Sequence, residues 1–457
     1  MSEIFPKPIL PTPHLVKKFY FLDYFYILLR SVKNHSNQNE IFESFKVLKK
    51  EYLLGESKYK KLTIDDDTEL SQKQIAKFFY TFEQVVSESH EYGLIEKESN
   101  TQRIKVVPQR KPSAKTKLSL ERKKNILLTE IGEKALRIYE NSKFDFNLFM
   151  LALMEEKHHS FYDLINLCYS DKKLKNGLMI FPIYSGLKLG IDKSSFTTHG
   201  HVLDYSKALI RQFENDIKAY TNKNISLIEQ EQILIGKLIA DKIIGENRND
   251  KFDPGKYNAT LSRFRKYWLN YFLKTIYNYP YSFSTFSIWI ERAKQCGVLN
   301  TTEFFPDFSG RIVYPTSVIL SNIKSNDFLK VFEYKTGQVL FIHKPRWEEE
   351  QNQIDFVKTL LDEYMIFQKM RKTHFVNLAD LKERVCFRNR LPGFVFDEFL
   401  EKSYQLNLKG ELRIQISLEA DRLPQETNAM YLRREPILVN GKYKNIIAIN
   451  YRRDNHE

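Results

Sequence analysis

The stretch that decides the fold runs from residue 72 to residue 139 and opens with QKQIAKFFYTFEQVV at 72–86. Apolar residues in this opening segment recur at the spacing of one helix face. They are Ile75, Phe78, Phe79, Phe82 and Val86. The spacing predicts an amphipathic helix over this segment, and we interpret it as the recognition helix of a DNA-binding module.

Two predicted strands and a second helix follow this helix. The residues YGLIEKE at 92–98 are typical of a helix end that passes into a strand, and NILLT at 125–129 predicts a second strand. Thr129 is a candidate N-cap for a helix that runs through Tyr139. A helix followed by a strand, a loop and a second strand is the order of a recognition helix and its β-wing in a winged-helix module.

The loop between the two predicted strands, here called the basic loop, is the most basic region of the chain. Residues 103–124 hold nine Lys or Arg residues and one acid, Glu121, and two prolines, Pro108 and Pro112, disfavour helix or central strand. The basic residues are Arg103, Lys105, Arg110, Lys111, Lys115, Lys117, Arg122, Lys123 and Lys124. Because nine cations repel one another unless they are solvated or bound to phosphate, we expect this loop to contact the DNA backbone. A solvated loop is the alternative.

The same order recurs between residues 257 and 319. A predicted helix at 284–296 stops at Gly297, a residue type that favours helix C-termini, and short predicted strands follow at 298–300 and 311–315. The helical stretch before them carries three further candidate DNA contacts, Arg263, Arg265 and Lys266.

A third instance occupies the C-terminus. We expect one helix at 354–370, a second that begins at Asn377 as its cap, and a third at 395–404, which is the candidate recognition helix. Alternating apolar and polar residues predict a half-buried strand at 412–418, and a closing strand follows at 446–449.

Arginines flank the predicted helices of this third module and occupy the loop after them. Arginine is the usual bidentate reader of guanine in the major groove, so Arg384, Arg388 and Arg390 are candidate DNA contacts. Ion pairs with Glu398 or Glu401 are the alternative for them. The predicted wing of this module adds three more candidates, Arg422, Arg433 and Arg434.

These patterns divide the chain into four parts. We expect a helical N-terminus with the first winged-helix module at 1–145, a helical connector at 146–250, a second module at 251–350 and a third at 351–457. The clearest linker signal, rich in Gly, Asn, Asp and Pro, lies near 245–256. The predicted fold class is mainly α with small β-wings (α+β), in which tandem winged-helix or helix-turn-helix modules are joined by the connector.

The composition is that of a globular, basic protein. The 457 residues carry a formal net charge of +14, which raises the affinity for polyanions such as nucleic acid. The three cysteines are far apart and form no CxxC pair, which argues against a zinc ribbon or redox dithiol and fits a reducing compartment. They are Cys168, Cys296 and Cys386. No signal peptide or membrane span is predicted, so we expect a cytoplasmic protein without a membrane partner.

An enzymatic alternative depends on three residues. Asp307, Glu333 and Lys335 have the order of a PD-(D/E)xK nuclease, in which the acids bind a metal ion and the lysine stabilises developing charge. His199 and His201 have no third ligand at a diagnostic spacing. The sequence holds no Walker A, GxGxxG or GxSxG motif. We therefore expect no catalytic activity and no cofactor, with Mg²⁺ only under the nuclease alternative.

Four segments of the chain carry a resemblance to a known family. They are YGLI at 92–95, LTEIGEKAL at 128–136, the stretch from Phe146 to Met154, and YDL at 162–164. Together they resemble the recognition half of type IIS restriction endonucleases, in which tandem winged-helix subdomains bind DNA and an L-T-x-x-G turn opens the helix after the wing. The second module, from IWI at 288–290 to VYP at 313–315, looks like a further subdomain of that sort, so the resemblance covers about residues 70 to 320. It departs from the family at the C-terminus, where a third predicted module takes the place of the cleavage domain.

From these patterns we predict a duplex DNA-binding subunit, selective for sequence or structure, of a prokaryotic restriction or antiviral defence system. It would recruit a nuclease or ATPase partner. Three alternatives stay open: a divergent metal-dependent endonuclease, a plasmid or phage replication initiator, and a scaffold in which winged helices bind other proteins.

Overall fold

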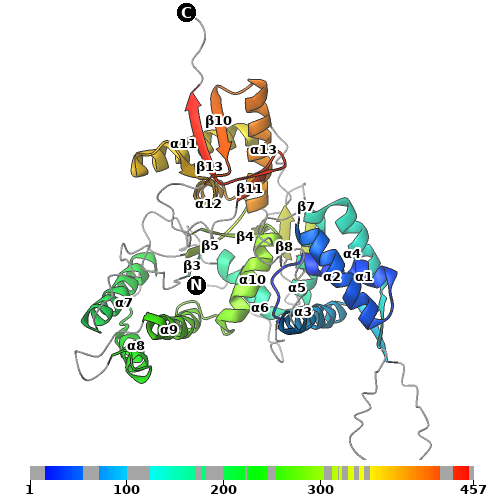
Figure 1. The fold of residues 1–457 in the computed structure, drawn as a ribbon, viewed down its shortest axis with the longest axis horizontal. Helices are drawn as coiled ribbons and strands as arrows, with labels where there is room; N and C mark the ends of the chain where they lie inside the picture. The colour runs from blue at the N-terminus through cyan, green and yellow to red at the C-terminus, as the bar shows by residue number, and fades with distance from the viewer. Residues whose placement is uncertain are drawn as a thin grey trace, which may run out of the picture. The chain divides into compact units, whose positions relative to one another are not determined.

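A computed structural model describes most of the chain as helices and small antiparallel sheets (Figure 1). The described residues are 16–54, 72–99, 124–170, 178–180, 199–221, 224–244, 254–302, 311–317, 319–321, 328–333, 339–343, 350–421 and 436–451. The mainly helical α+β class that we predicted is confirmed. Residues 15–157 form one compact unit, and residues 158–457 belong to a second.

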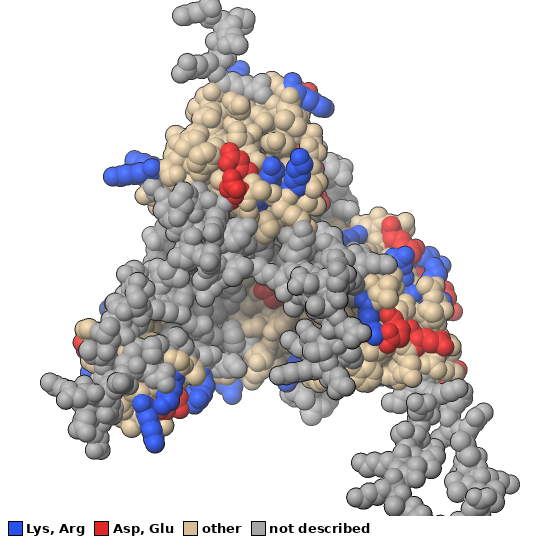
Figure 2. Space-filling view, in the orientation of Figure 1, with Lys and Arg blue, Asp and Glu red and all other residues tan. Residues whose placement is uncertain are grey.

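Acidic and basic side chains are interspersed over the described surface in the view of Figure 2. Among the helices that the structure describes, none combines the length and the apolar character needed to cross a membrane.

The N-terminal unit contains five helices and one hairpin within its described residues. In chain order they are α1 (Asp23–Asn34), α2 (Gln38–Leu54), α3 (Gln72–Glu91), β1 (Ile95–Ser99), β2 (Lys124–Leu128), α4 (Glu130–Asn141) and α5 (Lys143–Lys157). The predicted amphipathic helix at 72–86 corresponds to the first three quarters of α3, and both predicted strands are present. Of the predicted apolar face, Phe82 and Val86 are buried, whereas Phe79 is 40% exposed; Val85, which we did not assign to this face, is also buried.

Three antiparallel segments form the small sheet of this unit. Ile95 of β1 lies opposite Leu128 of β2. On the other side of β2, the backbone N–H of Ile126 donates to the carbonyl of Ser36 at 2.9 Å, and Asn37 forms a bridge with Asn125. β2, which comes last in sequence among these three segments, therefore lies between the other two.

The junction between this hairpin and α4 depends on two residues of the LTEIG segment. The Thr129 side chain accepts a hydrogen bond from the backbone N–H of Gly132 at 3.1 Å, which confirms Thr129 as the N-cap, and its hydroxyl donates to the carbonyl of Gly93 at 2.6 Å. A Cβ atom on Gly132 would lie 2.1 Å from the backbone oxygen of Leu94. Only glycine therefore lets α4 approach the start of β1 so closely.

The second unit begins with two helices and a sheet assembled from distant segments. The helices are α6 (His159–Ser170) and α10 (Phe283–Gln295), and the strands are β3 (Leu178–Ile180), β4 (Leu299–Thr302) and β5 (Arg311–Pro315), in the order β3-β5-β4. The indole N–H of Trp289 in α10 donates to the Ser160 hydroxyl of α6 at 2.7 Å. Both α6 and β3 lie in the segment that we expected to be a connector, so part of that segment belongs to this sheet and its helices.

Three further helices lie between β3 and α10. They are α7 (His199–Thr221), α8 (Ile228–Ala240) and α9 (Pro254–Thr275). The aromatic rings of Phe213 in α7 and Trp268 in α9 stack with their centroids 5.3 Å apart, and both residues are fully buried. This packing explains why the helical region has its own apolar core.

A small antiparallel sheet that we did not predict precedes the C-terminal module. Its strands are β6 (Ile319–Ser321), β7 (Phe328–Glu333) and β8 (Val339–His343), in the order β6-β8-β7.

The C-terminal module follows the predicted pattern closely. It contains α11 (Glu350–Arg371), β9 (Val376–Asn377), α12 (Leu378–Asn389), α13 (Gly393–Lys409), β10 (Ile414–Glu419), β11 (Ile437–Val439), β12 (Lys442–Lys444) and β13 (Ile446–Tyr451). The Asn377 side chain accepts a hydrogen bond from the N–H of Asp380 at 3.1 Å, so it caps α12 as expected. β13 lies between β10 and β9, and β11 and β12 form a separate hairpin.

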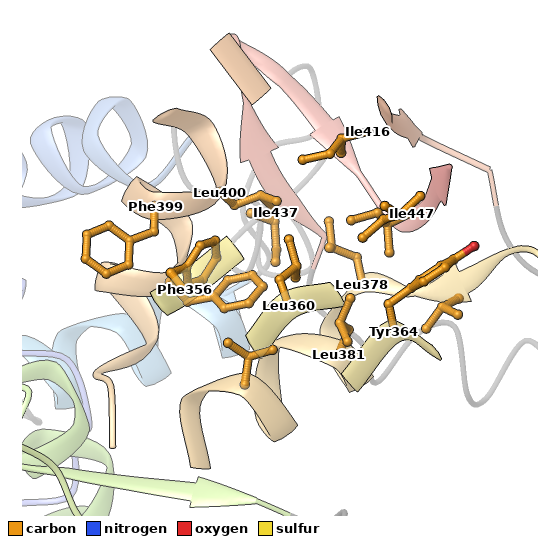
Figure 3. Packing of buried hydrophobic residues seen from close by; sticks show 14 of the residues in the cluster. Phe356, Leu360, Tyr364, Leu378, Leu381, Phe399, Leu400, Ile416, Ile437 and Ile447 are labelled. Carbon is orange, nitrogen blue, oxygen red and sulfur yellow. The ribbon is translucent and has the colours of Figure 1, made fainter. Parts of the chain in front are cut away.

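One hydrophobic core joins all three helices of this module to its sheet (Figure 3). Side chains from the helices and the strands point toward one another, and each of those labelled in Figure 3 is nearly or fully buried. They are Phe356, Leu360, Tyr364, Leu378, Leu381, Phe399, Leu400, Ile416, Ile437 and Ile447. At about 1.5–3 kcal/mol for each fully buried large apolar side chain, this core is the main source of stability of the module.

The same order of elements occurs three times. A helix, a short extended segment, further helices, a strand, a connection and a closing strand follow one another. The closing strand always lies between the other two segments. In the first instance the elements are α1, Asn37, α2, α3, β1 and β2. In the second they are α6, β3, α9, α10, β4 and β5. In the third they are α11, β9, α12, α13, β10 and β13. The second instance has α7 and α8 inserted, and the third has the β11–β12 hairpin inserted.

Candidate nucleic-acid interface

The basic loop joins the paired ends of β1 and β2. In the register of the hairpin, Ser99 lies opposite Lys124, the last residue of the basic loop and the first of β2. The other eight basic residues of the loop lie outside the described residues. Nine cations and one acid give residues 103–124 a net charge of +8, more than half of the +14 of the whole chain. More than half of the chain's net charge therefore belongs to the segment that joins β1 to β2.

The hairpin itself is anchored by apolar residues and is not basic. Ile95 of β1 and Ile126 of β2 are buried, whereas Glu96, Lys97 and Glu98 are exposed. The positive charge thus belongs to the loop and not to the strands that support it. A loop on a rigid hairpin can reach phosphates without any change in the core beneath it.

The helix before this hairpin, α3, has an exposed face of aromatic and polar side chains. Tyr80 is 49% exposed, and Gln84 and Ser87 are half-buried on the same side of the helix. The carboxylate of Glu83 accepts a hydrogen bond from the Gln38 side chain of α2. An amide, a hydroxyl and a phenol are groups that can donate to and accept from base edges. We did not identify these residues from the sequence, although their spacing between the apolar positions of α3 would have placed them on its exposed side.

The candidate residues of α9 are in part already engaged within the protein. The Arg263 guanidinium donates to the Asp241 carboxylate at 2.9 Å. A hydrogen bond from the Thr260 hydroxyl, assisted by Arg263, holds the pKa of Asp241 below its usual value. The side chains of Arg265 and Lys266 lie outside the described part of α9. Arg263 therefore stabilises the contact between α9 and the end of α8.

Two of the three candidate arginines near α12 form ion pairs with α11. The Arg384 guanidinium donates to the Glu363 carboxylate, and both side chains are largely buried. Arg388 lies 3.0 Å from a carboxylate oxygen of Asp362 and 3.5 Å from one of Glu363. Since residues four apart share one helix face, both arginines point to α11. From the sequence, ion pairs with Glu398 or Glu401 were our alternative for these arginines. The structure shows ion pairs, but the partners are Asp362 and Glu363 of α11.

The third arginine in this group, Arg390, connects the C-terminal module to the preceding sheet. It has a left-handed backbone conformation with φ of 54° at the end of α12. Its guanidinium carbon lies 4.7 Å from the ring centroid of Phe387 and 5.2 Å from that of Tyr314 in β5. Its carbonyl accepts a hydrogen bond from the N–H of Ser317 at 2.9 Å. These contacts give Arg390 a structural role between two modules.

The exposed side of α13, the candidate recognition helix of the C-terminal module, is acidic at its N-terminal half. Asp397, Glu398 and Glu401 lie there, and Lys402 and Lys409 follow. Lys382 of α12 approaches the Asp397 carboxylate at 2.6 Å, and Glu401 accepts a hydrogen bond from the N–H of Asn440 at 3.1 Å. In Figure 2 the visible surface of this module is mostly uncharged. Carboxylates at the start of a helix are repelled by phosphates, so α13 is poorly suited to enter a DNA groove.

The equivalent helix of the second instance, α10, is buried along most of its length. Ile288, Trp289, Ile290 and Arg292 are all buried. The outer side of α10 is formed by Ser284, which is exposed, and by Ser287, Glu291 and Lys294, which are half-buried, and the last two form an ion pair at 3.5 Å.

The remaining candidates lie mostly outside the described residues. Arg422, Arg433 and Arg434 belong to the part of the β10–β13 connection that the structure does not describe. Asp307, between β4 and β5, and Lys335, between β7 and β8, also lie outside the described residues. Glu333 is the last residue of β7, opposite Val339 of β8. Among the described residues, no group of three His, Cys, Asp or Glu side chains is arranged to hold a metal ion.

Comparison of the chain with family models, with curated proteins and with solved structures gave no match.

Proposed function

We propose that this chain is a duplex DNA-binding protein built from winged-helix modules, and that its N-terminal module holds the DNA. The observation that carries the proposal is the position of the basic loop. It joins β1 to β2 directly after α3, so a net charge of +8 is located where the wing of a winged-helix module would be. Phosphate contacts supply most of the sequence-independent affinity for DNA.

The repeated order of elements supports the winged-helix interpretation. In each instance the closing strand lies between an early extended segment and the strand that follows the last helix. This is the arrangement expected when a wing connects the two final strands and the helix before them is the recognition helix.

The three recognition-helix candidates differ in their suitability for DNA. The outer side of α3 carries Tyr80, Gln84 and Ser87, whereas that of α10 carries the Glu291–Lys294 ion pair and the N-terminal half of α13 is acidic. We therefore assign base contact to α3 and phosphate contact to the basic loop. The arginines at 384, 388 and 390 take no part in this proposal, because each is engaged inside the second unit.

We further propose that the chain acts as the recognition component of a prokaryotic restriction or antiviral defence system and recruits a nuclease or ATPase partner. The support for this part is the resemblance of residues 92–164 to the recognition half of type IIS endonucleases, together with the absence of nucleotide-hydrolysis motifs from the sequence.

A salt series of DNA binding tests the proposal. The affinity of the full chain for a labelled duplex and for the matching single strand would be measured by fluorescence anisotropy between about 50 and 300 mM salt. Each neutralised phosphate contributes about −0.9 to the log–log slope for duplex DNA, so engagement of half or more of the nine cations predicts a slope of about −4 or steeper. Salt-insensitive binding, or equal affinity for both DNA forms with a shallow slope, would contradict it.

A further inference from the structure

The outer side of α3 carries a line of polar side chains that take no part in the packing of the N-terminal unit. Tyr80, Gln84 and Ser87 follow one another at positions i, i+4 and i+7, the spacing of one helix face. Tyr80 is 49% exposed, and Gln84 and Ser87 are half-buried. Within the described part of the chain, no hydrogen bond or ring contact engages these three side chains. Their polar groups are therefore available to a ligand.

Two acids on the same side of α3 are engaged by groups of the N-terminal unit. The Glu83 carboxylate accepts a hydrogen bond from the Gln38 side chain, and Glu91 lies 3.0 Å from the Lys17 ammonium. Glutamate is the residue type that accepts from the amino group of cytosine, and these contacts occupy both carboxylates. Among the α3 side chains that the structure describes, residues 78–91, there is no Lys or Arg, the usual readers of guanine.

We propose that α3 selects A·T base pairs in the major groove, with Gln84 bound to an adenine and Tyr80 packed on a thymine methyl group. This selection rests on the proposed function, since it requires duplex DNA held by the N-terminal module. The Gln84 amide can donate to adenine N7 and accept from the N6 amino group, a bidentate pair that guanine cannot form. The Tyr80 ring is the apolar surface that a thymine 5-methyl group needs.

The spacing of the two side chains matches neighbouring base pairs. Tyr80 and Gln84 are about 6 Å apart along the helix axis, and stacked base pairs are about 3.4 Å apart, so the two contacts fall on base pairs one or two steps apart. The Ser87 hydroxyl can bond to either type of pair and adds no preference. His90, which is exposed in the last turn of α3, lies about 9 Å beyond Gln84 and contacts neither base pair.

Base analogues that each remove one contact atom or group test this selection. Duplexes bound by the full chain would first be selected from a randomised pool, and neighbouring A·T pairs are expected in the selected sequence. In that duplex, 7-deazaadenine in place of adenine lacks N7 and is expected to weaken binding about fivefold, the lower end of the discrimination that one bidentate pair gives. Uracil in place of thymine lacks only the methyl group and is expected to weaken binding about fourfold, the usual contribution of one buried carbon of this kind.

Substitutions in α3 should remove the two effects separately. Gln84→Ala is expected to bind the deazaadenine duplex and the unmodified duplex equally and to keep the effect of uracil. Tyr80→Ala is expected to bind the uracil and thymine duplexes equally, whereas Tyr80→Phe keeps the ring and should keep the wild-type difference.

Gln405→Ala on the outer side of α13 and Tyr20→Ala, at another exposed tyrosine of the N-terminal unit, are matched controls that should keep both differences. None of the substituted side chains is buried, so the melting temperatures should stay close to the wild-type value. A selected sequence without A·T pairs, wild-type binding that neither analogue weakens, or analogue effects that persist in Gln84→Ala and Tyr80→Ala would overturn the selection and leave DNA binding by the module intact. Loss of all salt-dependent duplex binding by the wild type would instead overturn the proposed function, and the selection with it.

Discussion

The N-terminal and C-terminal modules share one order of elements and differ in what they place on it. In the N-terminal module the connection between the last two strands carries the densest positive charge of the chain. In the C-terminal module the corresponding connection contains the β11–β12 hairpin, and Lys444 of that hairpin donates to the Leu418 carbonyl at 2.9 Å. The helices that precede these connections also differ. The outer side of α13 is acidic in its N-terminal half, whereas that of α3 carries Tyr80, Gln84 and Ser87. A common topology therefore supports different surfaces, and the surface decides what a module can bind.

The largest expected effect concerns a pair of helical glycines, one in each module. Gly132→Ala places a Cβ atom 2.1 Å from the backbone oxygen of Leu94, so α4 must move away from β1, and we expect a loss of about 3 kcal/mol or more. At Gly393 the nearest atom is the flexible Lys382 Cε at 3.4 Å, and Gly393→Ala is expected to be neutral or to stabilise by up to about 1 kcal/mol. Urea denaturation of the two variants compares them directly. Equal changes in the free energy of unfolding would show that the close approach of α4 to Leu94 at Gly132 does not require glycine.

The next largest effect tests the charge difference between the modules. Reversal of Arg110, Lys111, Lys115 and Lys117 to Glu is expected to weaken duplex binding at least about 100-fold at 0.1 M salt and to reduce the salt slope by about 4. A control variant with the same change in net charge reverses four exposed lysines elsewhere, Lys33, Lys218, Lys274 and Lys402. It should lose much less affinity. Wild-type affinity of the first variant at low salt, or equal losses in both, would exclude the basic loop as the contact.

Substitution of Arg384 separates a structural role from a DNA-binding role in the C-terminal module. Arg384→Met leaves the largely buried Glu363 with only Arg388 at 3.5 Å, so we expect a loss of about 2 kcal/mol in the free energy of unfolding. DNA affinity at temperatures where the variant is folded should stay at the wild-type value. A variant that keeps its stability but binds DNA more weakly would return Arg384 to the interface.

The two helix caps are expected to contribute similar, smaller amounts. Thr129→Ala removes the cap of α4 and the hydrogen bond to Gly93, and Asn377→Ala removes the cap of α12. Each should lower the free energy of unfolding by about 1–2 kcal/mol, and Thr129→Ser should recover most of the loss. Chemical denaturation monitored by circular dichroism measures all three. If Thr129→Ala proves neutral, the hydrogen bonds at this junction do not stabilise the hairpin.

The smallest expected effect concerns the three cysteines, whose rates of reaction with a thiol reagent should differ little in the folded protein. Burial is the main cause that raises the pKa of Cys386, to about 12, and it also raises the pKa of Cys168, while Cys296 is buried between α10 and β4. At pH 8 only about one in ten thousand thiols with a pKa of about 12 is ionised, so Cys386 should react slowly with a disulfide reagent until the chain is denatured. Burial should likewise keep the reagent from Cys168 and Cys296. Absorbance of the released thiolate follows this reaction. Rapid labelling of one thiol in the native protein would show that its surroundings open.

Much of the local structure was accessible from the sequence. The apolar spacing in α3, the caps at Thr129 and Asn377, and the alternating strand β10 depend on neighbouring residues, and each was predicted and is present. The sheet of β6, β7 and β8 was not predicted, because β7 (FLKVFE) and β8 (VLFIH) lack the regular alternation of apolar and polar residues that β10 shows. The partners of Arg384 and Arg388 were also missed. Their helical spacing puts them on one face, but it does not say which acids on another helix lie opposite.

The sequence by itself determined where α4 and α12 begin and where the positive charge is concentrated, because caps and composition are properties of adjacent residues. Only the tertiary structure decided that β3 pairs with β5 across the four described helices α7 to α10 and that Arg390 packs on Tyr314. It also decided that Glu291 and Lys294 pair on the outer side of α10 and that Gln38 of α2 bonds Glu83 of α3. These features depend on which surfaces pack together, and the packing of distant segments is a property of the whole folded chain.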